Sequence, residues 1–338
     1  MKAPFPWFGG KSRVAPEVWA ALGDVDNYIE PFAGSLAVLL ARSPHHKGTT
    51  ETVNDKDLFL ANFWRALIAD PDGVAHHANW PVNEADLFAR HMWLVQIGQT
   101  QMEEALLTDP DYFDSKIAGW WVWGVCSWIA GGWCSGTGPW SVDGGRVTKG
   151  ARGQGVNRQR PHLGDAGQGV NRVLPHLGNP GRGVNRQHES SLQSYLASLS
   201  ERLERVRVCT GDWGRVVTTG AMSYGSSVGI FLDPPYSGEL RDKDIYSEDD
   251  HEISHAVRQW ALDNGDNPRL RIVLAGYGPE HDHLMPQTWR RHWWSASAAY
   301  STSASALRGD GNHLNRLTEC LWMSPHCIQS LDMTLFDK

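Results

Sequence analysis

The feature that most constrains the fold is a short apolar run, residues 228–232, that ends abruptly in Asp233-Pro234-Pro235-Tyr236. Apolar runs of this length, bounded by turn-forming residues, are typical of buried strands. The two prolines have a fixed φ and no N–H group, so the strand cannot continue through them and the loop is stiff. In open α/β sheets, ligands lie just beyond the carboxyl ends of the strands. The run therefore predicts a buried strand with a ligand-binding loop at its end.

The loop offers three groups that suit a planar molecule with an exocyclic amino group. Asp233 carries an acceptor, Pro234 has a backbone carbonyl, and Tyr236 provides a flat face for stacking. A nucleobase turned out of its helix is such a molecule. A strand followed by a simple proline turn is the alternative interpretation, and the upstream residues decide between the two.

A second strand, turn and helix are predicted upstream. Residues 27–30 read as a strand that ends in Glu30, followed by a small-residue turn at Gly34-Ser35 and a helix from Leu36. This is the front of a nucleotide-binding βα unit. A dinucleotide fingerprint would have three glycines. The single glycine suits a cofactor without a pyrophosphate, and S-adenosylmethionine is such a cofactor.

Asp55 and Lys11 are two further candidates for ligand binding. Asp55 closes the next strand about 20 residues after the glycine turn, where a ribose hydroxyl is usually bound; capping the helix predicted at 58–68 is its alternative role. Gly10-Lys11-Ser12 resembles the end of a phosphate loop, but Phe5 stands where that motif needs a glycine. A ligand-contacting ammonium and a plain turn with a surface lysine both remain open for Lys11.

Four sequence elements occur in the order found in the Dam-type (D12 class) DNA adenine-N6 methyltransferases. They are Phe8-Gly9-Gly10-Lys11, Glu30 to Ser35, Asn54-Asp55, and Asp233 to Tyr236. The chain resembles a member of this family over residues 5–70 and 205–325, and we expect a solitary, phage-encoded one. The order of its motifs is similar to that of the alpha group of amino-methyltransferases.

The resemblance implies the fold and the reaction. It implies an α/β fold: a Rossmann-like S-adenosylmethionine-dependent methyltransferase sheet with a mostly helical inserted target-recognition region. We expect residues 1–70 and 206–338 to form the catalytic domain and 71–205 the insert. The implied reaction is methyl transfer to N6 of a flipped-out adenine in DNA. Cytosine-N4 methylation and a non-catalytic DNA-binding protein on the same scaffold are the alternatives. Asp233 favours adenine, since serine is common at this position in cytosine-N4 enzymes.

The resemblance also assigns site residues. The catalytic residues are Asp233, Pro234, Pro235 and Tyr236. The cofactor-binding residues are Trp7, Gly10, Lys11, Glu30, Pro31, Phe32, Gly34, Ser35, Asp55, Asp212, Trp213 and Asp233. For Asp212 and Trp213 a simple turn is the alternative. Leu36 departs from the family pattern, which often has a second glycine at this position.

The insert combines tryptophan-rich helices with a basic repeat. Helices are predicted over 83–107 and 114–130, and the second is apolar all round, so we expect its tryptophans to pack in a core. Gly-x-Gly-Val-Asn-Arg recurs at 153–158, 167–172 and 181–186, a period of fourteen. The repeat lies in a stretch, 146–188, whose only acid is Asp165.

DNA contacts are expected from this basic stretch and from nearby aromatic side chains. The candidates are Arg152, Arg158, Arg172, Arg186, Trp133, Trp140 and Tyr246. A solvated low-complexity insert is the alternative for the repeat, and stacking on bases or packing are equally open for Trp133 and Trp140.

Composition limits the partners. The formal net charge of −7 argues against a uniformly basic surface, so DNA contacts would be local. No apolar stretch reaches the ~20 residues of a membrane span. Five scattered cysteines without a C-x2-C pair indicate reduced thiols in the cytoplasm and no zinc site. We expect double-stranded DNA as the partner, no membrane, no metal, and a monomer or weak homodimer.

Overall fold

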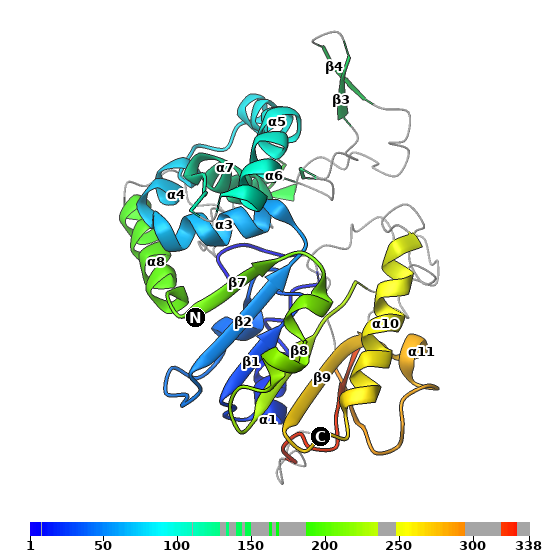
Figure 1. Ribbon diagram of the computed structural model, residues 1–338. Coiled ribbons are helices and arrows are strands. Elements are labelled where there is room, and N and C mark those ends of the chain that lie inside the picture. Colours follow the sequence, from blue (N-terminus) through cyan, green and yellow to red (C-terminus); the bar gives the residue numbers. More distant parts are fainter. Residues whose placement is uncertain are drawn as a thin grey trace. The chain divides into compact units, whose positions relative to one another are not determined.

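The computed structural model describes residues 1–7, 9–109, 111–128, 133–134, 140–143, 146–149, 162–163, 167–168, 187–235, 248–294 and 319–329 (Figure 1). The chain divides into two compact units. Unit 1 comprises Met1–Trp7 and Lys56–Thr210, and unit 2 comprises Phe8–Asp55 and Gly211–Lys338. These borders differ from those of the expected domains, 1–70 with 206–338 and 71–205. The division into a catalytic and a target-recognition part stays a prediction.

A mixed sheet organises unit 2, with the strand order β10-β11-β9-β8-β1-β2-β7. The strands of the sheet are β1 (Asn27–Glu30), β2 (Thr50–Asp55), β7 (Val206–Thr210), β8 (Val228–Leu232), β9 (Leu270–Tyr277), β10 (Arg290–Trp293) and β11 (Glu319–Met323). β7, the last in this order, is counted with unit 1. β8, β1, β2 and β9 pair in parallel, and β11 runs antiparallel between β9 and β10. The predicted Rossmann-like α/β fold is confirmed.

The register brings the ends of three neighbouring strands to one edge of the sheet. β1 lies between β8 and β2, with Ile29 opposite Ile230 on one side and Thr52 on the other. All five residues of β8 are buried, as the apolar run predicts. Because the carboxyl ends of parallel strands meet at the same edge, the residues that follow or close β1, β2 and β8 are neighbours.

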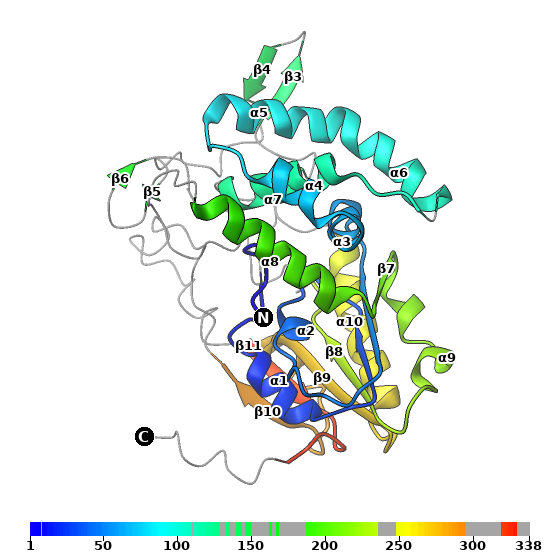
Figure 2. The same cartoon turned by 90° about the vertical axis from the view of Figure 1, so that its left-hand side faces the viewer.

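Helices cover both faces of this sheet. The helical segments of unit 2 are α1 (Ala15–Leu22), α2 (Ala37–Leu40), the 3-10 segment η4 (Trp213–Val216), α9 (Thr219–Met222), α10 (Glu248–Asn264) and α11 (Gly278–His281). Figure 2 shows α1 and α2 on one face and α10 on the other. The apolar side of α1, which includes Val18 and Leu22, is fully buried. These layers bury the strands and leave the loops at their carboxyl ends to form a site.

Unit 1 is mostly helical in its described part. Its helical segments are α3 (Leu58–Ala69), α4 (Pro71–Ala78), α5 (Glu84–Trp93), the π-helical segment η1 (Leu94–Gly98), α6 (Gln99–Thr108), α7 (Ser115–Ser127) and α8 (Gln187–Leu203). The short strands β3 (Trp140–Asp143) and β4 (Arg146–Lys149) pair with each other, as do β5 (His162–Leu163) and β6 (Gly167–Gln168).

Two features of unit 1 correct the sequence analysis. The helix predicted over 83–107 is two α-helices joined by η1, because its hydrogen bonds widen to the π pattern at Leu94–Gly98. α4 was not predicted. It begins at Pro71, which suits a first helical position, and the side chain of Asp70 accepts from Gly73 N–H at 2.9 Å.

Asn62 fastens α3 to the start of α7. Its Nδ2 donates to the carbonyl of Asp114 at 3.0 Å, and its Oδ1 accepts from the N–H of Asp114 at 2.9 Å. Asn62 is fully buried. We expect Asn62→Ala to lower the free energy of unfolding by about 2–4 kcal/mol, because both backbone groups lose their partner. Urea unfolding followed by circular dichroism measures this loss. Gln101→Ala, at an exposed position, should have little effect on stability. An equal loss of stability in both variants would show that the two hydrogen bonds of Asn62 do not stabilise the fold.

Candidate active site

The glycine turn after β1 is tied to the end of β2. The N–H of Gly34 donates to Oδ2 of Asp55 at 2.9 Å, and the N–H of Ala33 donates to the carbonyl of Asn54, also at 2.9 Å. Gly34 has φ +48°, a left-handed conformation that favours glycine. The alternative role of Asp55, capping the helix that follows, is wrong. The N-cap of α3 is Asp57, whose carboxylate accepts hydrogen bonds from N–H groups of the first turn.

Leu36 stands where the D12 class often has a second glycine, and its backbone adopts the conformation that glycine favours. Its φ is +58°, so a leucine holds the left-handed conformation that glycine adopts without strain. The left-handed conformation costs a non-glycine residue roughly 1–2 kcal/mol. The Leu36 side chain is fully buried, and this burial offsets the cost.

Asn54 joins three loops at this edge of the sheet, although the sequence analysis gave it no role of its own. Its Nδ2 donates to the carbonyl of Pro31 at 3.1 Å and to that of Gly211 at 3.0 Å. The N–H of Gly211 in turn donates to the carbonyl of Asp55 at 3.0 Å. Oδ1 of Asn54 is buried and has no hydrogen-bond partner within the described ranges. Its place directly before Asp55 was the available signal.

Asp212 and Trp213 follow Gly211, so they enter the site from the chain segment after β7. The carboxylate of Asp212 accepts from the N–H of Gly214 at 2.8 Å and caps η4. The ring of Trp213 stacks near that of Phe32, with centroids 6.2 Å apart and planes 27° apart. The structure therefore brings Phe32, Asp212 and Trp213 to the edge where Asp55 lies.

Lys11 forms an ion pair with the first residue of the proline loop. Its Nζ lies 2.9 Å from Oδ1 of Asp233 and donates to the carbonyl of Gly9 at 2.6 Å. The side chain of Lys11 is 3% exposed and that of Asp233 19%. Lys11 was assigned to the cofactor by the resemblance, and its partnership with Asp233 was not foreseen. The alternative of a surface lysine in a plain turn is wrong.

Glu30 is a buried carboxyl group at the end of β1. Burial raises its pKa to about 8, and the negative charges of Asp233 and Asp55 act in the same direction. A hydrogen bond from the Tyr28 hydroxyl at 2.9 Å opposes this rise. Glu30 is therefore largely protonated at neutral pH.

The raised pKa of Glu30 predicts a pH-dependent stability. The folded protein holds the Glu30 proton up to a pH of about 8, whereas the unfolded chain releases it near its ordinary value of 4.5. The contribution of Glu30 is thus fully present below pH 4.5 and is lost as the pH rises towards 8. The slope reaches at most about 1.4 kcal/mol per pH unit.

Glu30→Gln should flatten this dependence, because glutamine resembles the protonated acid at every pH. Urea unfolding at pH 6 and at pH 8.5 measures it in both proteins. We expect the wild type to lose more stability than the variant over this interval. Parallel losses in the two proteins would contradict the assigned pKa.

The remaining predicted residues fall into three groups. Pro31, Ser35 and Pro234 are buried near the strand ends, while Gly10 is exposed and Pro235 is half-buried. Trp7 is counted with unit 1, where its ring lies 5.7 Å from that of Phe5. Tyr236, Tyr246, Arg152, Arg158, Arg172, Arg186 and the side chain of Trp140 lie outside the described residues.

Trp133 is held inside unit 1. Its Nε1 donates to the carbonyl of Trp121 at 3.0 Å, and its ring lies 5.2 Å from those of His91 and Trp128. A Cβ atom on Gly124 would collide with this ring, so the glycine provides the space for it. Trp121 and Trp123 of α7 are buried, as expected of core residues. A contact of Trp133 with DNA stays a prediction.

Comparison with known proteins identifies the class of protein. Residues 7–108 match the model of the D12 class N6 adenine-specific DNA methyltransferase family. No curated protein matches the chain. The match and the α/β sheet define a DNA methyltransferase. Over these residues the chain is similar to the D12 class, and this match supports methylation of adenine in DNA at N6. The cytosine-N4 and non-catalytic alternatives are set aside, since this family is adenine-specific and enzymatic.

None of the helices in the described ranges is both long and apolar enough to pass through a membrane. Among the described residues, no group of three or more His, Cys, Asp or Glu side chains is placed to hold a metal ion.

Proposed function

We propose that the methyl donor is S-adenosylmethionine and that it binds at the carboxyl edge of the unit 2 sheet, next to Asp233. One observation carries the proposal: three adjacent parallel strands end in carboxyl groups at the same edge. Glu30 ends β1, Asp55 ends β2, and Asp233 follows β8. The order β8-β1-β2 makes these three acids neighbours.

The charges at this edge fit a cationic cofactor without phosphate groups. Glu30, Asp55, Asp212 and Asp233 are acids, whereas Lys11 is the one basic residue among the predicted cofactor contacts, and it is paired with Asp233. A pyrophosphate would require backbone N–H groups or cations that face it. The buried Oδ1 of Asn54 is an acceptor that a bound ligand can satisfy.

We assign the parts of the cofactor by chemistry. Asp55 would accept hydrogen bonds from the ribose hydroxyls, and Phe32 and Trp213 would flank the adenine ring. Glu30, Lys11 and the turn at Gly34-Ser35 would surround the amino-acid end, together with Gly10 and Pro31. Trp7 remains a predicted contact. S-adenosylmethionine supplies a methyl group already activated by its sulfonium, so no metal is required.

Asp233 and Pro234 would prepare the amino group of the target adenine. The N6 lone pair is delocalised into the purine ring, which makes the amino group a poor nucleophile. Hydrogen bonds accepted by the Asp233 carboxylate and the Pro234 carbonyl would favour a more tetrahedral nitrogen. Asp233 need not be a strong base, because the amino group becomes acidic only as it is alkylated. Most of the acceleration then comes from positioning, with Pro235 stiffening the loop and Tyr236 stacking on the base.

The DNA partner and the compartment are proposed on sequence grounds. We propose double-stranded DNA, contacted by the arginines of the 146–188 stretch and by Trp133, Trp140 and Tyr246. A flipped-out adenine implies a duplex from which it is displaced. We place the protein in the cytoplasm, where thiols stay reduced, and expect a monomer or weak homodimer.

Product analysis tests the donor and the base together. The purified protein is incubated with unmethylated duplex DNA and S-adenosylmethionine labelled in its methyl group, and the DNA is digested to nucleosides. We expect labelled N6-methyladenine by mass spectrometry. Labelled N4-methylcytosine would contradict adenine as the target base. A lack of any S-adenosylmethionine binding would contradict the proposed methyl donor.

Asp55→Asn tests the cofactor assignment. Asparagine keeps the volume and an acceptor for the N–H of Gly34, but it removes the charge offered to the ribose hydroxyls. We expect the affinity for S-adenosylhomocysteine, measured by isothermal titration calorimetry, to fall about 10- to 100-fold. The matched control is Asp266→Asn at an exposed loop, which should leave the affinity unchanged. Equal affinities for the Asp55 variant and the wild type would contradict this role.

A further inference from the structure

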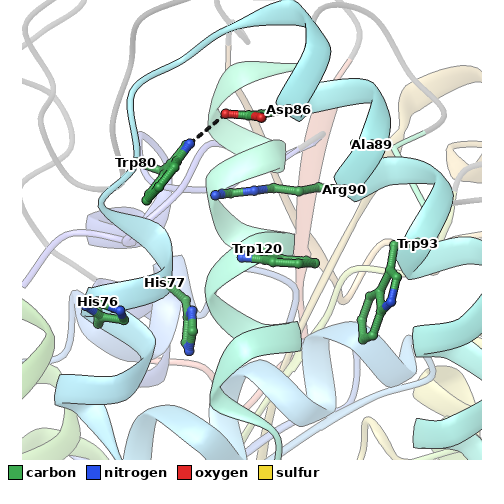
Figure 3. A pocket seen from close by; sticks show the side chains of 8 residues that line it. All are labelled: His76, His77, Trp80, Asp86, Ala89, Arg90, Trp93 and Trp120. Carbon is green, nitrogen blue, oxygen red and sulfur yellow. Dashed lines mark hydrogen bonds between the residues drawn. The ribbon is translucent and has the colours of Figure 1, made fainter.

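A cavity lies in unit 1, and its lining shares no residue with the site described above. It has a volume of about 430 Å³ and is formed by side chains of α4, α5 and α7 and the loop after α4. Pockets for small ligands typically have volumes of about 300–1,000 Å³. Figure 3 shows Arg90 extending across this cavity between Asp86 and Trp120. The space is therefore large enough for one small molecule and has a charged group within it.

Arg90 is a buried cation. Its guanidinium group lies against indole rings, whereas one of its nitrogens has no acceptor among the described residues. Its guanidinium carbon lies 5.2 Å from the ring centroid of Trp80, 5.0 Å from that of Trp120 and 4.3 Å from that of Trp123. The residue is 8% exposed. One nitrogen of the guanidinium, Nη1, is buried and has no hydrogen-bond partner in the described part of the chain.

Packing alone does not explain this arrangement of Arg90. The indole rings satisfy the faces of the guanidinium, but they offer no acceptor to the N–H groups in its plane. A buried N–H group without an acceptor destabilises the fold. A ligand with an acceptor on its edge would remove this cost. The unpartnered nitrogen belongs to a side chain that lines the cavity, and this combination suits a bound ligand with an acceptor.

The walls of the cavity are flat aromatic rings. Trp80 is 47% exposed, and Trp93 and Trp120 are half-buried, so part of each ring stays accessible beside the cations that lie against it. Nζ of Lys116 lies 4.5 Å from the ring centroid of Trp93 and 4.6 Å from that of Trp120. A cationic ligand, which aromatic walls alone would attract, is disfavoured here because Arg90 and Lys116 already occupy these rings.

The polar groups of the cavity narrow the ligand class further. Oδ2 of Asp86 accepts from Nε1 of Trp80 at 2.7 Å and from Asn83, so this acid fixes Trp80 in place. Burial and the neighbouring His76 lower the pKa of His77, which leaves a neutral imidazole with one donor and one acceptor. A bare phosphate would not use the rings, and an aliphatic molecule would not satisfy Arg90.

We propose that this cavity binds an unpaired nucleobase, stacked on the indoles and hydrogen-bonded through an edge acceptor to Arg90. Nucleobases combine a flat aromatic face with carbonyl or ring-nitrogen acceptors, and proteins hold unpaired ones by such stacking. Two sources share this chemistry: a free nucleoside monophosphate, and an unpaired base in a DNA strand. The site is separate from the one assigned to methyl transfer and does not depend on that assignment.

Two variants test the site without emptying it. Ala89 is exposed and lines the cavity, so Ala89→Phe places a ring where it obstructs the space, without removing any polar side chain. Arg90→Lys keeps the positive charge and removes the planar fork. Ala85→Phe is the matched control, since Ala85 is exposed on the same helix and does not line the cavity. Circular dichroism confirms that each variant is folded.

Binding of the four deoxynucleoside monophosphates and of a single-stranded oligonucleotide is measured by calorimetry with the full chain. S-adenosylhomocysteine is present throughout at saturation. We expect binding to weaken about tenfold or more in Ala89→Phe and Arg90→Lys and to be unchanged in Ala85→Phe. If the variants bind the monophosphates more weakly, the ligand of the cavity is a free nucleotide. If only binding of the oligonucleotide is weaker, the ligand is an unpaired base in a strand. If Ala89→Phe and Ala85→Phe bind every probe alike, the proposal is overturned.

Discussion

Asp233→Asn should lower the rate of methyl transfer by about 10²- to 10⁴-fold at saturating cofactor. Asparagine has the size of aspartate, so the loop after β8 keeps its shape. It presents one carbonyl oxygen in place of a carboxylate, and its amide N–H₂ would face the amino group of the adenine as a second donor. The variant also loses the ion pair with Lys11, whose Nζ lies 2.9 Å from Oδ1 of Asp233.

A single-turnover assay with labelled cofactor measures the chemical step directly. Asp266→Asn, at an exposed loop of the same unit, is the control and should retain the wild-type rate. Because Asp233 was also assigned to the cofactor site, the affinity for S-adenosylhomocysteine is measured beside the rate. A rate within threefold of the wild type would show that Asp233 does not act on the amino group; a loss that more cofactor restores would assign it to cofactor binding alone.

Local sequence patterns predicted the central strand and the glycine turn after β1 well. β8 spans Val228–Leu232, the bounds of the apolar run, because the prolines that follow cannot extend a ladder. Asp55 reaches the turn after β1 because two adjacent parallel strands end at the same edge, and the spacing of acid and glycine reflects that geometry. Both features depend on residues near one another in the chain.

Features that depend on distant residues were not predicted. The Lys11–Asp233 ion pair joins residues that are far apart in the sequence, and nothing local to Lys11 indicates its partner. The same holds for Asn54, whose side chain binds the loop at Gly211. The cavity in unit 1 was not predicted for the same reason, because it depends on the packing of separate helices. Periodicity predicted buried tryptophans in α7, yet only the packing of α5 beside it leaves Trp120 facing Arg90.

Lys11→Met should lower the rate of methyl transfer about 10- to 100-fold, since a misplaced reacting group loses activity of this order. Methionine retains much of the buried stem but cannot pair with Asp233 or donate to Gly9. The carboxylate is then left without its cation and adopts other rotamers. Lys11→Arg keeps the charge and should recover part of the rate, whereas a lysine that merely packs would be replaced equally well by methionine.

A double-mutant cycle separates positioning of Asp233 from an independent role of Lys11. If Lys11 acts through Asp233, the Lys11→Met change should cost little in a chain that already carries Asp233→Asn, because the group to be positioned is gone. Single-turnover rates of the wild type, both single variants and the double variant give the coupling, with circular dichroism as the folding control. If the losses in rate multiply in the double variant, Lys11 acts on the cofactor alone, as the family resemblance implies. If the double variant is no slower than Asp233→Asn, Lys11 is the residue that positions the Asp233 carboxylate.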